Sequence, residues 1–125
     1  MAGRISYLGN IPVNGLVLDV DAGKVDSYPR TGSVWTDLSI YRNGGTLTNG
    51  STFSSENVGG MVFDGSNDYT VFQNTSTIPL WVDGWTNGTG YLLNGVISMT
   101  QIYNKEIVAS QVLQNHKTTK RRFGL

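Results

Sequence analysis

The sequence predicts an all-β fold, an antiparallel sandwich or barrel, in a single domain of 125 residues. Sixteen glycines punctuate the chain, and seven of them follow Asn or Asp in pairs that tolerate the positive φ of tight hairpin turns. Between these pairs lie short runs rich in β-branched and aromatic residues. Such runs, separated by turn residues, are typical of antiparallel strands.

Seven strands are expected along the chain. They are Leu16–Asp21, Gly45–Thr48, Met61–Phe63, Tyr69–Phe72, Ile78–Val82, Tyr91–Leu93 and Val96–Tyr103. In the first strand, Leu16, Leu18 and Val20 point to one side, and Asp19 and Asp21 point to the other. This alternation predicts one dry face and one partly wet face.

One helix is predicted over residues 107–118, between an all-β body and a C-terminal tail of residues 119–125. Its apolar residues recur four apart and form a stripe along one side: Val108 with Val112, Ala109 with Leu113, and then His116. Basic residues gather where the helix macrodipole favours positive charge: Lys117, Lys120, Arg121 and Arg122. A solvated helix end is preferred to a nucleic-acid or capsid contact. Residues 1–12 are interpreted as an N-terminal arm.

Composition narrows the class of protein. Nine basic residues balance nine acidic ones, so the chain lacks the field that attracts nucleic acid or an acidic membrane surface. We expect neither partner. No apolar run approaches the roughly 18 residues of a membrane helix, and the first residues lack a signal-peptide core. The chain has no cysteine and one histidine, which leaves almost no material for thiolate, triad or zinc chemistry.

Five stretches of the chain resemble a known family when they are taken in order. They are GLVLDVDAG (15–23), SYPRTGSVWTDLS (27–39), NGGTLTNG (43–50), TFSSENVGGMVFDGSNDY (52–69) and ISMTQIYNKEIVASQVLQNHKTTKRRFGL (97–125). Each is similar to the matching part of concanavalin A-like jelly-roll domains of the laminin-G type. The likeness is greatest to the versions found in marine bacteriophage structural proteins.

The resemblance implies a two-sheet antiparallel jelly roll and a non-enzymatic virion protein, made in the host cytoplasm without a signal peptide. The expected role is capsid decoration or cementing by protein–protein adhesion. The alternative is a lectin-like adhesin of a tail fibre or baseplate that binds host-surface glycans. Only residues 71–98 separate the FDGSNDY element from the last strand, which is shorter than in the family. Missing strands expose edges, so we expect virion proteins and copies of this chain as partners.

Carboxylates are few, and no enzyme is expected. The chain has only two glutamates, Glu56 and Glu106, and neither belongs to a glucanase-type motif. A retaining glycosidase needs two carboxyl groups about 5–5.5 Å apart across a cleft. Asp19 and Asp21 share a strand face, but a structural role is preferred for both.

Asp64 and Asp68 bracket the polar segment of MVFDGSNDYTVF and are the candidate metal ligands. Counted from Asp64 as an EF-hand loop, glycine falls at position 2 and Thr75 at position 12, so the motif is absent. A hairpin turn is the preferred interpretation. The alternative is a looser Ca²⁺ site completed by backbone carbonyls, and no cofactor is expected.

The best candidates for a glycan or protein contact are aromatic and amide side chains in the middle of the chain: Trp81, Trp85, Tyr91 and Asn87. Sugar sites combine aromatic faces with polar groups, and tryptophan is also enriched at protein interfaces. An interface or core role is preferred. Trp35 is expected to fill the core.

Overall fold

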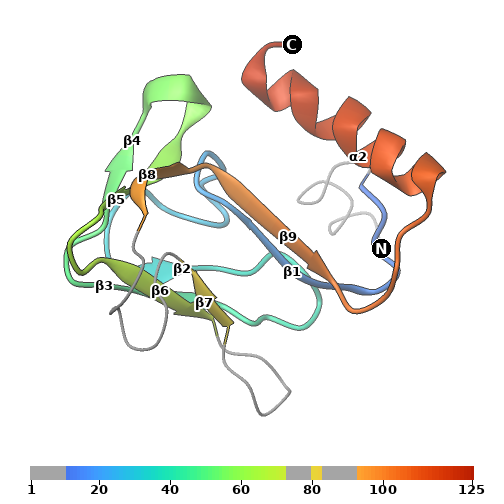
Figure 1. The fold of residues 1–125 in the computed structure, drawn as a ribbon. Helices are drawn as coiled ribbons and strands as arrows, with labels where there is room; N and C mark the ends of the chain where they lie inside the picture. The colour runs from blue at the N-terminus through green and yellow to red at the C-terminus, as the bar shows by residue number, and fades with distance from the viewer. Residues whose placement is uncertain (1–10, 73–79, 83–92) are drawn as a thin grey trace.

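The computed structural model describes residues 11–72, 80–82 and 93–125. The fold is mostly β, with antiparallel strands and one short helix near the C-terminus (Figure 1). The strands are β1 (Leu16–Asp21), β2 (Val34–Trp35), β3 (Gly45–Thr48), β4 (Thr52–Ser54), β5 (Gly60–Asp64), β6 (Tyr69–Phe72), β7 (Leu80–Val82), β8 (Asn94–Ile97) and β9 (Met99–Tyr103). Helical segments are η1 (Glu56–Val58), α2 (Ala109–Lys120) and η2 (Arg121–Phe123).

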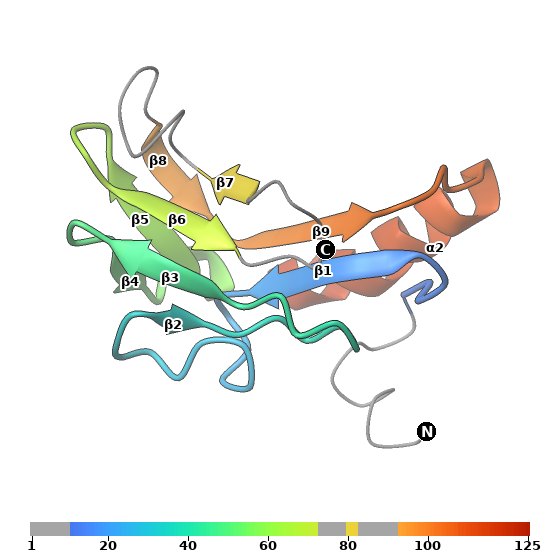
Figure 2. The same cartoon turned by 90° about the horizontal axis from the view of Figure 1, so that it is seen from below.

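The strands form three small sheets. Their orders are β1-β9, β2-β3-β6-β7 and β4-β5-β8, and every pairing is antiparallel. Only Ser98 separates β8 from β9, so this stretch of chain pairs first with β5 and then with β1. Figures 1 and 2 show α2 running alongside the β1-β9 pair.

All three sheets contribute side chains to one core. The period-2 pattern is clear in β5 and β6, where Met61 and Phe63, and then Thr70 and Phe72, are buried in alternation with partly exposed neighbours. The core also contains Leu18 and Val20 of β1, Leu47 of β3, Ala22 and Tyr28. Trp35 is fully buried and its ring lies 5.8 Å from that of Phe72, which confirms its predicted core position.

The predicted strands agree with the structure where the pattern is regular and differ where it is not. The first, second and fourth predictions match β1, β3 and β6 residue for residue. The third is one residue short at each end, and the last is two strands, β8 and β9. The short strands β2 and β4 were not predicted. The strand expected at Tyr91–Leu93 falls largely outside the described residues, and Leu93 is not in a strand.

The prediction that Asp64-Gly65 turns a hairpin is wrong. β5 pairs with β4 and β8, whereas β6 pairs with β3 and β7, so the segment carries the chain from one sheet to another. Asn49-Gly50 does the same between β3 and β4, with φ of +67° and +105°. A pair with positive φ reverses the chain locally, and the packing of the core decides which strands then pair.

The second face of β1 is drier than predicted. Asp19 and Asp21 are both buried, with exposed fractions of 2% and 1%. Side chains from distant segments cover this face, among them Gln101 of β9 and Arg122 of η2. The sequence predicts a partly wet face because no local pattern indicates that residues so distant in the chain cover it.

The helix begins and ends two residues later than predicted, and its sides are reversed. The side turned to the sheet is polar: Asn115 hydrogen-bonds with Tyr103, and Thr118 and Thr119 line a cavity with residues of β9. The predicted apolar stripe faces outward, with Val108, Val112 and Leu113 each at least half exposed. Val108 is the N-cap and has no side-chain oxygen, but Gln111 Oε1 accepts its backbone N–H at 2.9 Å.

The arm and the tail are anchored where the structure describes them. Ile11 is buried, and the Pro12 carbonyl accepts a 2.7 Å hydrogen bond from the Tyr103 hydroxyl. The tail of residues 119–125 is largely helical and carries Arg122, which packs on β1. In the described part of the chain, no helix combines the length and the apolar character that a membrane span requires.

Gly45 should be required at its position. A Cβ there would lie 2.5 Å from Phe72 Cε1 and 2.8 Å from Thr70 Cγ2, and both side chains are fully buried. We expect Gly45→Ala to lower the free energy of unfolding by about 1–3 kcal/mol through overpacking. The matched control is Gly44→Ala, whose Cβ would meet only ordinary contacts from 3.5 Å outward. Urea unfolding measures both, and equal stabilities would contradict this account of the core.

Candidate functional site

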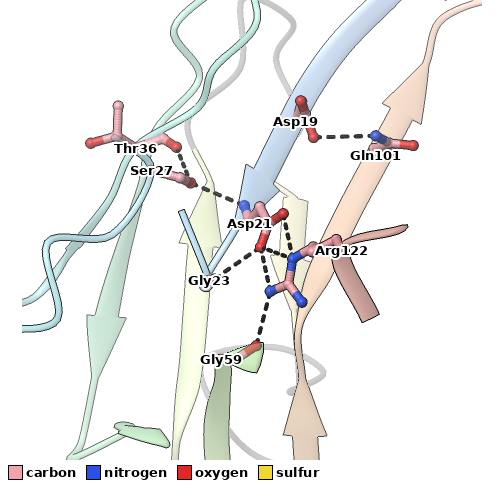
Figure 3. Close-up of polar contacts among 8 residues, drawn as sticks. All are labelled: Asp19, Asp21, Gly23, Ser27, Thr36, Gly59, Gln101 and Arg122. Carbon is pink, nitrogen blue, oxygen red and sulfur yellow. Dashed lines mark hydrogen bonds and ion pairs between the residues drawn. The ribbon is translucent and has the colours of Figure 1, made fainter. Parts of the chain in front are cut away.

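A buried polar network at the end of β1 is the densest group of chemically reactive side chains among the described residues. It joins Asp19 and Asp21 of β1 to the loop after β2, to β9 and to η2, and Figure 3 shows its centre. Buried carboxylates are candidates for catalysis or for ion binding, so their bonding partners decide what they can do.

Asp37 holds the loop between β2 and β3. Its Oδ1 accepts the backbone N–H groups of Asp19 and Ser39, each at 2.8 Å. Its Oδ2 accepts the Ser39 hydroxyl and the Asn43 N–H, each at 2.7 Å. The Asn43 amide in turn donates to the Val17 carbonyl. Four short bonds therefore occupy this buried carboxylate, and three of them come from backbone N–H groups.

Asp21 forms the link to the C-terminus. The Arg122 Nε lies 2.7 Å from both carboxylate oxygens of Asp21, and Arg122 Nη2 donates to the Gly59 carbonyl at 3.0 Å. Only 11% of the Arg122 side chain and 1% of the Asp21 side chain are exposed. One guanidinium thus ties together η2, the end of β1 and the loop that enters β5 (Figure 3).

The chain leaves just enough room for this guanidinium. Asp21 Oδ1 also accepts the Gly23 backbone N–H at 2.9 Å, which bends the chain directly after β1. A Cβ on Gly23 would overlap Arg122 Nη2 and the Val58 carbonyl oxygen. Ser27 completes the bend, because its hydroxyl accepts the Asp21 N–H and donates to the Thr36 carbonyl.

Of the three carboxylates in the network, Asp19 is the one whose cost of burial is least offset by hydrogen bonds and opposite charges. Burial raises its pKa from 3.8 to about 6, and the charges of Asp21 and Asp37 act in the same direction. Lys24 and a 3.4 Å hydrogen bond from Gln101 Nε2 oppose the rise. A carboxyl group of this kind changes charge near neutral pH, but its side chain is almost inaccessible to a ligand.

A cavity of about 130 Å³ lies between α2 and the β1-β9 pair. Its lining includes Gln101, Thr118, Thr119 and the Asp21–Arg122 pair. The volume corresponds to about four water molecules and is well below the roughly 300–1,000 Å³ of a small-molecule site. Ile11 and Met99 add apolar surface to this lining, and the cavity is partly open to solvent.

The candidate metal residues Asp64 and Asp68 both bond to the backbone of their own turn. Asp64 Oδ1 accepts the Ser66 N–H at 2.8 Å, and Asp68 Oδ2 accepts the Asp64 N–H at 3.1 Å. Asp68 is buried and its Oδ1 has no hydrogen-bond partner, whereas Asp64 is exposed. Residues 11–72, 80–82 and 93–125 contain no group of three or more His, Asp or Glu side chains placed to hold a metal ion. These contacts support the turn role, and the cofactor expectation stays a prediction.

Of the candidates for a glycan or protein contact, only Trp81 belongs to the described residues. Trp81 lies in β7, where its backbone pairs with Val71 of β6. Trp85, Asn87 and Tyr91 lie outside the described residues. Their assignment to an interface or to a glycan stays a prediction.

Sequence reasoning missed Arg122 and Asp37 as the organisers of the network. Asp37-Leu38-Ser39 and Asp21-Ala22-Gly23 are spaced for a side-chain oxygen to accept the N–H two residues later, and this is a recognisable turn signal. No local signal pairs Asp21 with a side chain 101 positions away.

Comparisons of the chain with models of known protein families, with curated proteins and with solved structures gave no match. The chemistry of the network is therefore inferred from its own geometry.

Breaking the ion pair should be costly. We expect Arg122→Met to lower the free energy of unfolding by about 3–5 kcal/mol, because it leaves the buried Asp21 carboxylate unpaired. Arg121→Met is the matched control, since Arg121 is exposed, and it should change stability by no more than about 0.5 kcal/mol. Adding Asp21→Asn to Arg122→Met should recover part of the loss. Urea unfolding curves in which the two single variants coincide would refute the role of the pair.

The stability of the fold should also depend on the charge of Asp19. Because its folded pKa of about 6 exceeds the ordinary 3.8, protonation contributes stability that is fully present below about pH 3.8 and is lost as pH rises through about 6. We expect Asp19→Asn to raise the free energy of unfolding at pH 7.5 by up to about 3 kcal/mol, at 1.36 kcal/mol per pKa unit. At pH 4 the gain should nearly vanish. A gain that is independent of pH would show that Asp19 ionises normally.

Proposed function

We propose that this chain is a non-catalytic adhesion module that decorates or cements a bacteriophage particle. Its proposed fold is a laminin-G-like jelly roll with few strands, made in the host cytoplasm and carried on the virion surface. Its partners are other virion proteins and copies of itself, bound through strand edges and exposed apolar side chains.

The observation that carries the proposal is the combination of open edges with apolar side chains on them. Within the described strands, the short strands β2 and β8 each lie at the end of a sheet and have one neighbour. Val34 on β2 is 58% exposed and Val96 on β8 is 52% exposed. A strand edge supplies unpaired backbone groups to a partner strand, and apolar side chains beside it supply buried area. This is the chemistry of β-augmentation.

The carboxylate network favours adhesion over catalysis. Asp37 accepts four hydrogen bonds from backbone and neighbouring side chains, and Asp21 is paired with Arg122. Groups so occupied hold the fold together. Five stretches of the chain resemble phage structural proteins in the same order, and this resemblance is the reason for proposing a bacteriophage particle as the location.

Two charges on the edges test the proposal. We expect Val34→Glu with Val96→Glu to lower the affinity of the recombinant chain for purified particles by at least about tenfold. Each buried valine is worth about 1.5 kcal/mol or more, and 1.4 kcal/mol is a factor of ten. Val25→Glu is the matched control, because Val25 is 60% exposed in the turn after β1 and lies on no strand. Quantitative mass spectrometry of particles after incubation and washing counts the bound copies.

The wild-type chain should reach a fixed stoichiometry of many copies per particle. Failure to bind particles, or equal binding by the edge variant and the control, would count against decoration through strand edges. A glycan-array signal that disappears in Trp85→Ala, without any particle binding, would support the tail-fibre or baseplate adhesin instead.

A further inference from the structure

The outward side of α2 is an apolar surface that no described residue covers. We define it as the α2 stripe: Ala109, Val112, Leu113 and His116, at the i, i+3, i+4, i+7 spacing of a helix that packs against another helix. All four residues are exposed, Val112 to 52% and Leu113 to 50%. Such a stripe normally faces the core of its own domain.

The stripe faces outward because the contacts of the polar side of α2 with the sheet are more favourable. Asn115 meets Tyr103 on that side, and Arg122 neutralises the buried Asp21. An unpaired buried carboxylate costs more than the exposed halves of the Val112 and Leu113 side chains. Turning the helix to bury Val112 and Leu113 would break the ion pair, so the described part of the domain leaves the stripe uncovered.

We propose that the α2 stripe binds the α2 stripe of a second copy of this chain, with the two helices antiparallel about a twofold axis. This inference deepens the proposed adhesion function, and rests on it, by naming the partner of one surface.

The stripe is complementary to itself in size. With the twofold axis between Val112 and Leu113, Val112 of one copy faces Leu113 of the other. Small Ala109 then lies opposite the larger His116. A twofold interface uses the same patch on both copies, so this match satisfies both halves at once.

The charges at the ends of the stripe select the antiparallel orientation. The exposed Glu106 precedes α2, and Lys117, Lys120 and the exposed Arg121 follow the stripe. Antiparallel helices place Glu106 of one copy near Lys120 of the other. Parallel helices would bring two lysine-rich ends together, and like charges at close range disfavour that arrangement. Lys105 also precedes α2, but the aliphatic part of its side chain lies against Gly15, just before β1.

The interface is small, so the expected dimer is weak in solution. Twelve helical residues span about 18 Å, and one such pair of helices falls below the roughly 1,200–2,000 Å² of a stable interface. Copies held close together on a particle would pair far more readily than free copies, because proximity raises their effective concentration.

Sedimentation equilibrium of the full chain, from about 10 μM to 1 mM, tests the pairing. The wild-type mass should rise from that of a monomer toward that of a dimer. Leu113→Asp should weaken association at least about tenfold, because a charge in an apolar contact is costly. Ser110→Asp is the matched control, since Ser110 is exposed on α2 outside the stripe, and it should associate like the wild type.

A charge exchange tests the orientation. Glu106→Lys and Lys120→Glu should each weaken association by roughly two- to fivefold, as expected for exposed ion pairs. The double variant should recover it, and circular dichroism should show an unchanged fold for all variants. Because the chain has no cysteine, Leu113→Cys introduces a single thiol beside the axis, and oxidation should link it to its own copy. Ser110→Cys should not be linked in this way.

A monomeric wild type at 1 mM that also gives no Leu113→Cys dimer would overturn the pairing. If that monomer still binds particles at wild-type copy number, the adhesion function stands without it. Association that survives Leu113→Asp, or a double charge variant that fails to recover, would equally place the contact elsewhere. Intact pairing with no particle binding would overturn the adhesion function and leave the pairing in place.

Discussion

The ion pair between Asp21 and Arg122 is the interaction on which the rest of the structure depends. It joins the end of β1 to η2 across 101 positions of the chain, and it recruits the Gly59 carbonyl that leads into β5. The pair is almost fully buried, so each charge requires the other. Because Arg122 must reach Asp21, the preceding helix is held against β9 with its polar side inward.

This constraint explains why a molecule with a substantial core exposes apolar groups elsewhere. The core draws Trp35 and Phe72 from one sheet and Phe63 from another, and it contains no residue of α2. The helix covers the polar face of β1 and borders a small, partly open cavity, and its own aliphatic residues remain outside. Together with the exposed valines Val34 and Val96 on edge strands, they leave apolar side chains at the surface.

The network also shows how a few carboxylates can organise long loops. Asp37 bonds to the backbone of β1 and of its own loop, and Asp21 bonds to the bend that follows it. Asp19 lies between them with a raised pKa, since burial is only partly offset by Gln101 and Lys24. Asp19 therefore carries a cost of burial that its contacts do not remove.

The sequence by itself determined the elements with strong local signals. The alternation in Leu16–Asp21 is enough to place one strand, and the β-branched and aromatic runs between turn residues are enough to place Gly45–Thr48 and Tyr69–Phe72. The apolar spacing at residues 108–116 is enough to place a helix. Tertiary structure alone decided which strands pair, so Asp64-Gly65 joins two sheets instead of closing a hairpin. It also decided which side of the helix is buried. Local periodicity shows which residues share one side of a segment. Which side is buried depends on a distant partner, here the carboxylate of Asp21.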